Sequence, residues 1–158
     1  MKTKQPFGLL PIISRGWSRK GSHPTVIVNS KNECTNVFGA RSVCSFVFLF
    51  SEKNQNAFVK FLDKLLRRWG RVCLFVDDGS CHYGVIVGEF LSLHRKTFRL
   101  FYFSMYLPQV NLVGQCWKPA RRALSNRVVL LLLSAKYRLR TEFDRGVFLP
   151  KMFKYLSN

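Results

Sequence analysis

The segment from Phe58 to Trp69 constrains the fold more than any other part of the sequence. Its apolar residues recur at i, i+3, i+4, i+7, i+8 and i+11, and charged residues occupy the opposite face. Gly70 follows directly, where a helix is expected to stop. A helix with one apolar face has to bury it, so this segment must pack on another layer of structure.

The segments around this helix supply that layer. Short stretches rich in Val, Phe and Thr are typical of strands, and we expect them at residues 25–28, 35–50, 71–76 and 97–103. A second helix is expected over residues 83–93, and helices with a break at Pro119 from about residue 111. This order predicts one α/β domain over residues 1–158, with a mixed sheet and helices packed on it.

The charge of the chain is strongly unbalanced. Twenty-six Lys and Arg face eight Asp and Glu, so the net charge is 26 − 8 = +18, and residues 90–141 hold ten basic residues and no acid. With 47% hydrophobic residues the chain is no disordered basic tail. A protein with this positive charge is expected to bind phosphate groups, so nucleic acid is the first expected partner.

The cysteines and the apolar runs indicate a compartment. The five cysteines are odd in number and include no C-x-x-C, which predicts reduced and buried thiols. The longest apolar runs, 46–50 and 128–133, fall short of the roughly 20 residues of a membrane span. We therefore expect a cytoplasmic, nucleoid-associated protein without a membrane or a small-molecule partner.

The hexapeptide Asp77-Asp78-Gly79-Ser80-Cys81-His82 is the most informative candidate site. It follows the apolar strand 71–76, and carboxylates at the carboxyl end of a central strand lie where open α/β folds bind ligands. The alternative is that Asp78 or Ser80 only caps the following helix. His82 by itself is more typical of a turn or core histidine than of a metal ligand.

Asp77–His82 also resembles the Asp-Asn-x-x-x-His element of mariner-like, insertion-sequence DDE-type transposases. Three further stretches resemble the same superfamily in order and spacing. They are Arg15–Pro24, Asn36–Ala40 and the segment from Leu107-Pro108 to Trp117-Lys118. The resemblance extends from about Phe7 to Arg127.

The resemblance implies a ribonuclease H-like fold, with a mixed sheet covered by helices on both faces. It further implies three carboxylates that hold two divalent ions, Mg²⁺ or Mn²⁺, about 3.5–4 Å apart for DNA strand cleavage and strand transfer. Asp77 matches the second carboxylate, and Asp78 stands where the family has Asn.

The other two carboxylates have no counterpart at the matching positions. Gly114 stands where the third is expected, and the first falls near Thr3, where no acid is present. Asp78 is a weak substitute, and Glu89 is poorly placed, twelve residues after Asp77. We therefore expect a truncated, degenerate catalytic domain without the usual helix-turn-helix domain, in which Asp77 is vestigial and no metal is bound.

Basic residues on the later helices are the candidate DNA contacts. Lys118, Arg121 and Arg122 are spaced i, i+3, i+4 on one helix face, and Arg127 lies beyond them. The alternative is an ordinary solvated face. The aromatic stretch 98–106 is interpreted as strand and core rather than as a platform for stacking bases.

Three hypotheses about function remain open. The first is an inactive, DNA-binding transposase derivative. The second is a half-enzyme completed by an upstream reading frame, and Gly114 argues against it. The third is a non-catalytic interaction protein that blocks transposon ends or associates with other copies, and a homodimer is left open under each of them.

Overall fold

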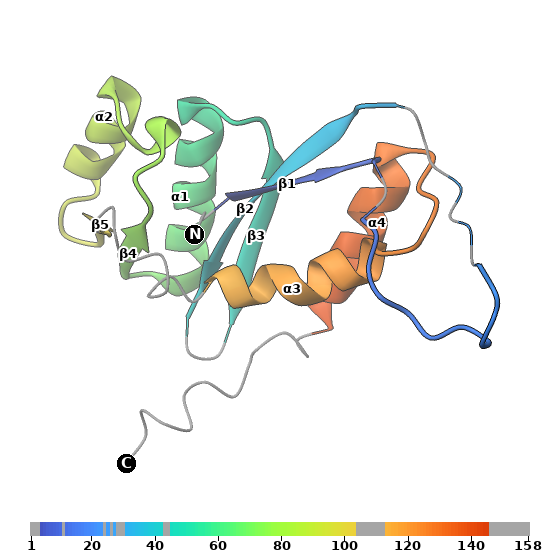
Figure 1. Ribbon diagram of the computed structural model, residues 1–158. Helices are drawn as coiled ribbons and strands as arrows, with labels where there is room; N and C mark the ends of the chain where they lie inside the picture. Colours follow the sequence, from blue (N-terminus) through green and yellow to red (C-terminus); the bar gives the residue numbers. More distant parts are fainter. Residues whose placement is uncertain are drawn as a thin grey trace, which may run out of the picture.

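Strands and helices follow one another along the chain in the predicted order (Figure 1). The computed structural model describes residues 4–10, 12–23, 25, 27, 31–42, 45–103 and 113–145. Within these residues the elements are β1 (Lys4–Gly8), β2 (Cys34–Arg41), β3 (Phe46–Ser51), α1 (Gln55–Trp69), β4 (Val72–Val76), the short 3₁₀ turn η1 (Ser80–His82), α2 (Val85–Leu93), β5 (Phe98–Tyr102), α3 (Val113–Leu124) and α4 (Leu132–Asp144).

The described strands form two sheets, an antiparallel one of three strands and a parallel one of two, rather than a single mixed sheet. β2 lies between β1 and β3 and is antiparallel to both, with Val37 opposite Phe50 and Gly39 opposite Phe48. β4 and β5 pair in parallel, with Val76 opposite Tyr102. Parallel neighbours need a crossover, and α2 supplies it here. The carboxyl ends of β4 and β5 therefore meet at one edge.

The expected helix over residues 58–69 is confirmed as α1, and its ends are set by two specific residues. The Asn54 side chain accepts a hydrogen bond of 2.8 Å from the Ala57 backbone N–H, so the helix begins three residues earlier than the apolar pattern indicates. Gly70 ends it in a left-handed conformation, φ 74°, and donates its N–H to the Leu66 carbonyl.

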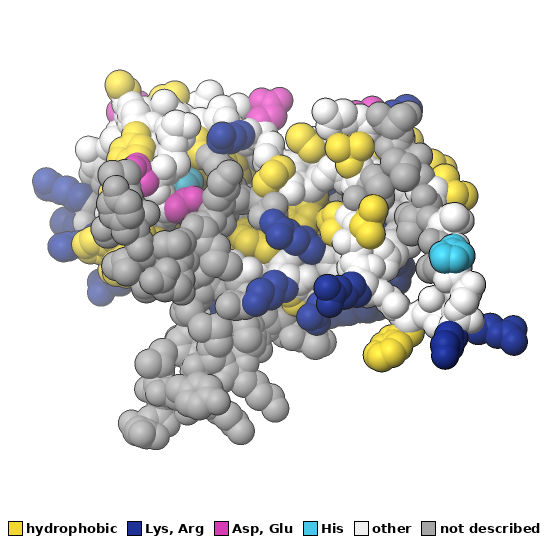
Figure 2. All heavy atoms as spheres, in the orientation of Figure 1, with side chains coloured by type: hydrophobic (Ala, Val, Ile, Leu, Met, Phe, Trp, Pro, Cys, Tyr) yellow, Lys and Arg dark blue, Asp and Glu magenta, His cyan; other side chains and the backbone are white. Residues whose placement is uncertain are grey.

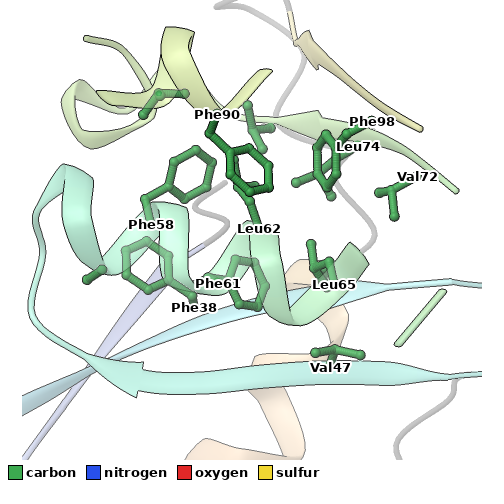
Figure 3. Packing of buried hydrophobic residues seen from close by; sticks show 14 of the residues in the cluster. Phe38, Val47, Phe58, Phe61, Leu62, Leu65, Val72, Leu74, Phe90 and Phe98 are labelled. Carbon is green, nitrogen blue, oxygen red and sulfur yellow. The ribbon is translucent and has the colours of Figure 1, made fainter. Parts of the chain in front are cut away.

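One face of the β1–β3 sheet packs on α1 (Figure 3). The Phe38 ring lies 5.6 Å from that of Phe61 and 5.8 Å from that of Phe58, measured between centroids. On its other side α1 contacts residues of β4, α2 and β5, including Leu74, Phe90 and Phe98. This first core places β4, and so Asp77, against α1.

The opposite sheet face packs on α3 and α4. Trp117 of α3 lies among the rings of Phe7, Phe46 and Phe143, at centroid distances of 5.9–6.1 Å. Phe46 and Phe48 alternate with Val47, which faces α1, because successive strand residues point to opposite faces. The predicted arrangement with helices on both faces is confirmed.

Two sequence-based expectations are wrong. Pro119 does not break the helix but lies inside α3, because the buried Trp117, Ala120 and Leu124 hold this segment against the sheet while proline removes only one N–H. The chain leaves the helix after Leu124, and Asn126 adopts φ 53°.

The second concerns the strand expected at residues 25–28. Thr25 and Ile27 are exposed and lie outside any strand, and Val26 and Val28 fall outside the described residues.

The cysteines differ partly from expectation. Cys81 and Cys116 are free and buried as predicted, whereas Cys34 and Cys73 are free but exposed. Cys73 is exposed because it points away from the core on β4, whose residues alternate between buried and exposed.

Among the described residues, no helix combines the length and apolar character that crossing a membrane requires.

The contact between Gly39 and Trp117 supplies a stability test. A Cβ atom at residue 39 would lie 2.6 Å from Trp117 Cη2 and 2.8 Å from Phe46 Cζ. We expect Gly39→Ala to lower the free energy of unfolding by about 1–3 kcal/mol through overpacking, measured by urea denaturation.

Gly88 on α2 is the matched control, because a Cβ there meets nothing within 4 Å. Gly88→Ala is expected to raise the free energy of unfolding by about 0.5–1 kcal/mol through helix propensity. Equal effects of the two substitutions would contradict the described packing of Trp117 on β2.

Candidate functional site

Asp77 comes directly after β4, at the edge where that strand and β5 end. Its side chain is 19% exposed, and its Oδ1 lies 3.5 Å from His82 Nδ1. The same nitrogen lies 2.8 Å from the Asp77 backbone oxygen. A carbonyl oxygen can only accept a hydrogen bond, so His82 Nδ1 carries the proton and donates the hydrogen bond to the Asp77 backbone oxygen.

His82 is a core residue of this turn. It is fully buried, and its ring packs on that of Phe58 at 4.4 Å. Its Nε2 is buried without a hydrogen-bond partner among the described residues. The expectation of a turn or core histidine is confirmed, and His82 holds the Asp77 backbone against α1.

Asp78 is exposed and is bound by a tyrosine. The Tyr83 hydroxyl donates a hydrogen bond of 2.5 Å to Asp78 Oδ1. The Tyr83 ring stacks on the Tyr102 ring at 4.5 Å with an interplanar angle of 10°. The Tyr102 hydroxyl in turn donates to the His82 backbone oxygen at 3.1 Å. The two tyrosines therefore connect the turn after β4 to the end of β5.

The alternative that Asp78 or Ser80 caps the next helix is wrong. α2 begins after Gly84, and no side chain caps it, while η1 begins after Gly79. Gly84 has φ 127°, which residues with a Cβ rarely adopt. The Asp78 carboxylate is available to Tyr83 instead because η1 separates it from the helix.

The carboxylate changes the ionisation of both tyrosines. The hydrogen bond to Asp78 is the main reason that the pKa of Tyr83 rises from 10.0 to about 12, since it stabilises the neutral phenol. Burial raises the pKa of Tyr102, and the negative charge of Asp78 raises it further. Both hydroxyls are therefore hydrogen-bond donors at neutral pH.

The remaining candidate metal ligands do not assemble around Asp77. Gly114 is buried in the first turn of α3 and has no side chain to offer. Glu89 is exposed on α2, and Thr3 lies outside the described residues. Across the part of the chain that the structure describes, no three His, Cys, Asp or Glu residues are grouped to hold a metal ion. The described donors thus do not fit a two-metal centre.

The predicted basic residues lie on the surface of α3 and just after it. Lys118, Arg121 and Arg122 are exposed, opposite the buried side that includes Trp117 and Ala120. Arg127 is exposed beyond the helix. Figure 2 shows Lys and Arg side chains gathered over α3. The structure places this cationic surface, Lys118/Arg121/Arg122/Arg127, on the layer opposite α1.

Tyr83 and Tyr102 were not identified from the sequence. The signal that could have found Tyr102 is the parallel register, because Tyr102 is opposite Val76, the residue before Asp77. No periodicity marks Tyr83, since it lies in an irregular turn between η1 and α2.

The sequence matches the family model described as DDE superfamily endonuclease over residues 5–130. No curated protein matches it. Among solved structures, the Mos1 transposase paired-end complex with the left transposon end is 15% identical with a TM-score of 0.66, and the comparison covers 96% of this chain and 52% of that one. The Mos1 mariner paired-end complex with Mn is 15% identical with a TM-score of 0.63, over 96% and 52%.

The chain thus spans about half the length of these structures. At this identity the likeness concerns the fold, and the predicted ribonuclease H-like α/β architecture is confirmed.

The link between Asp78 and Tyr83 can be tested by titration. We expect Asp78→Asn to lower the pKa of Tyr83 from about 12 toward 10, because the carboxylate is the main cause of the rise. The measurement is the ¹³Cζ chemical shift of labelled tyrosine as a function of pH. Asp77→Asn is the control and is expected to change this pKa less, since Asp77 is the weakest contributor. Equal shifts in both variants would contradict the assignment.

Proposed function

The chain belongs to the DDE superfamily endonuclease family, and from this we propose that it is a transposase-like DNA-binding protein whose own catalytic centre is degenerate. Gly114 is the observation that carries the proposal. It is buried in the first turn of α3, where the sequence resemblance expects the third carboxylate.

The donor set around Asp77 supports this proposal. Enzymes of this superfamily generally use divalent metal ions, which stabilise the attacking and leaving oxygens of phosphoryl transfer. Mg²⁺ gives up its water reluctantly and needs several well-placed oxygens. Here Asp77 offers one carboxylate, and Asp78 is hydrogen-bonded to Tyr83. We infer that Asp77 is a vestigial ligand and that Mg²⁺ or Mn²⁺ is not held.

Charge and fold support DNA as the partner. The net charge is +18, and Lys118, Arg121 and Arg122 are exposed side by side on α3. The structures with a similar fold include a transposase in complex with a transposon end. Contacts from Lys and Arg to phosphates position a protein on DNA without reading its sequence. We therefore propose sequence-tolerant duplex binding through this cationic surface, in the micromolar range or weaker.

The cationic surface can be tested by the salt dependence of binding. Replacing Lys118, Arg121 and Arg122 together by Gln should reduce the slope of log K against log salt by about 2–3, because each phosphate contact contributes about 0.9. Fluorescence anisotropy with a labelled duplex measures this slope.

A matched triple variant at α1 controls for charge alone. Lys53, Lys60 and Arg68 are exposed on or just before the helix that covers the other sheet face. Replacing these three by Gln removes the same charge and should leave the slope nearly unchanged. An equal reduction in both variants would show that net charge, rather than the α3 surface, determines binding.

The degenerate centre predicts that the protein does not nick DNA. Incubation with supercoiled plasmid and Mg²⁺ or Mn²⁺ should leave the plasmid intact, because the described donors are too few to hold the metal. Gel electrophoresis measures the nicked fraction, and Asp77→Ala serves as the control for contaminating nuclease. Nicking by the natural chain that Asp77→Ala abolishes would overturn the proposal.

A further inference from the structure

The outer face of the β4–β5 pair exposes a row of aromatic rings. Successive strand residues alternate between faces, so Val72, Leu74 and Val76 are buried while Cys73 and Phe75 point outward. On β5, Phe98 is buried and Phe101 is exposed. Phe75 is 54% exposed and Phe101 is 42% exposed. The interpretation of residues 98–106 as strand is confirmed for Phe98–Tyr102, but only the inner side of that strand is core, and residues 104–106 lie outside the described residues.

The rings on this face contact one another, one pair stacked and one pair tilted. Phe75 and Phe101 are register partners, and their rings lie 5.1 Å apart with an interplanar angle of 22°. The Phe103 ring lies 5.8 Å from that of Phe75, at 30°. Scattered exposed apolar residues are ordinary on a protein surface, but a contiguous, ordered group indicates an interaction site.

Cations surround the amino end of the same pair of strands. Arg99 is exposed and pairs in register with Cys73, so it lies on the same outer face, two residues before Phe101. Arg71 precedes β4, and Lys96 lies in the turn before β5; both are exposed. None of these three cations forms an ion pair within the described residues. Figure 2 shows Lys and Arg at the left edge, beside the turn between α2 and β5.

Charge complementarity selects the occupant of this face. A second copy of the chain docked here by the same face, with its strands parallel to these, would bring Arg71, Lys96 and Arg99 against the same cations, which is repulsive. A partner with flat apolar faces and a negative backbone fits both features. Unpaired bases stack on aromatic side chains, and their phosphates are attracted by nearby Lys and Arg.

We propose that the outer face of β4–β5 is a single-stranded DNA-binding surface, with bases stacked on Phe75 and Phe101 and phosphates paired with Arg99. The choice of DNA over RNA rests on the proposed function. The surface is separate from Lys118/Arg121/Arg122/Arg127, and paired bases are not available to stack there. Loss of this surface therefore affects single strands and leaves duplex binding by α3 in place.

The test compares two labelled probes of equal length by fluorescence anisotropy. One is a twelve-nucleotide oligothymidylate, and the other is an abasic oligomer with the same phosphates. Phe75→Ala and Phe101→Ala should each weaken oligothymidylate binding by about 5- to 100-fold. They should leave binding of the abasic probe and of duplex DNA nearly unchanged. Phe101→Tyr keeps an aromatic face and should retain binding.

Tyr137→Ala is the matched control, because Tyr137 is 74% exposed on α4, away from these strands. It should not change binding of either probe. Circular dichroism verifies that each variant is folded. If an alanine variant does not fold, Phe101→Tyr still reports on the face, because it keeps the aromatic ring.

Several results would overturn the proposal. They are unchanged oligothymidylate binding in both alanine variants, an equal loss on the abasic probe, and tighter binding of an oligouridylate of the same length. A second set would assign the face to another partner. Those results are a dimer in sedimentation that the alanine variants dissociate, and binding to anionic phosphatidylserine vesicles that depends on Phe75. If duplex binding fails while the aromatic-dependent binding of single strands persists, the α3 proposal is wrong and this one stands.

Discussion

Burial of both faces of the β2–β3 hairpin is the constraint on which the rest of the structure depends. Phe38 and Val47 pack toward α1, whereas Val37, Phe46 and Phe48 pack toward α3 and α4. Gly39 leaves the space that lets Trp117 reach the sheet. Because two layers of helices cover one thin sheet, the cationic residues of α3 are directed outward on one side and β4 is held by α1 on the other. The positions of the cationic surface on α3 and of the outer face of β4–β5 follow from these contacts.

The turn after β4 is held in place by contacts between groups of the protein itself. His82 fixes the turn after β4 through a hydrogen bond to the Asp77 backbone, and Tyr102 binds the His82 carbonyl. These contacts serve the backbone and the packing rather than a metal ion. The Tyr83 hydroxyl donates a hydrogen bond to the Asp78 carboxylate, and this bond is the main reason that the pKa of Tyr83 is raised. Packing on α1 and these hydrogen bonds therefore hold the end of β4.

The amphipathic pattern of residues 58–69 and the apolar runs on either side predicted the layered α/β order, since each pattern reports burial directly, but they did not predict β1 (Lys4–Gly8). The break at Pro119 was wrongly placed because local propensity was outweighed by the burial of Trp117 and Leu124. The pairing of Tyr83 with Asp78 depends on the irregular turn around Gly84, which has no sequence periodicity. The exposed Phe75–Phe101 pair was missed because aromatic residues in a short strand suit either face, and only the packing of α1 shows which one is covered.

We propose that this DDE-type fold carries a cationic surface and no functional metal centre. The most direct test is a titration of the protein with Mn²⁺, followed by electron paramagnetic resonance, in the natural chain and in Asp77→Ala. We expect the signal of free Mn²⁺ to be equally strong in the two proteins, both without DNA and with it, where DNA phosphates lower the signal by the same amount in each. Loss of the free signal in the natural chain, restored by Asp77→Ala, would contradict it.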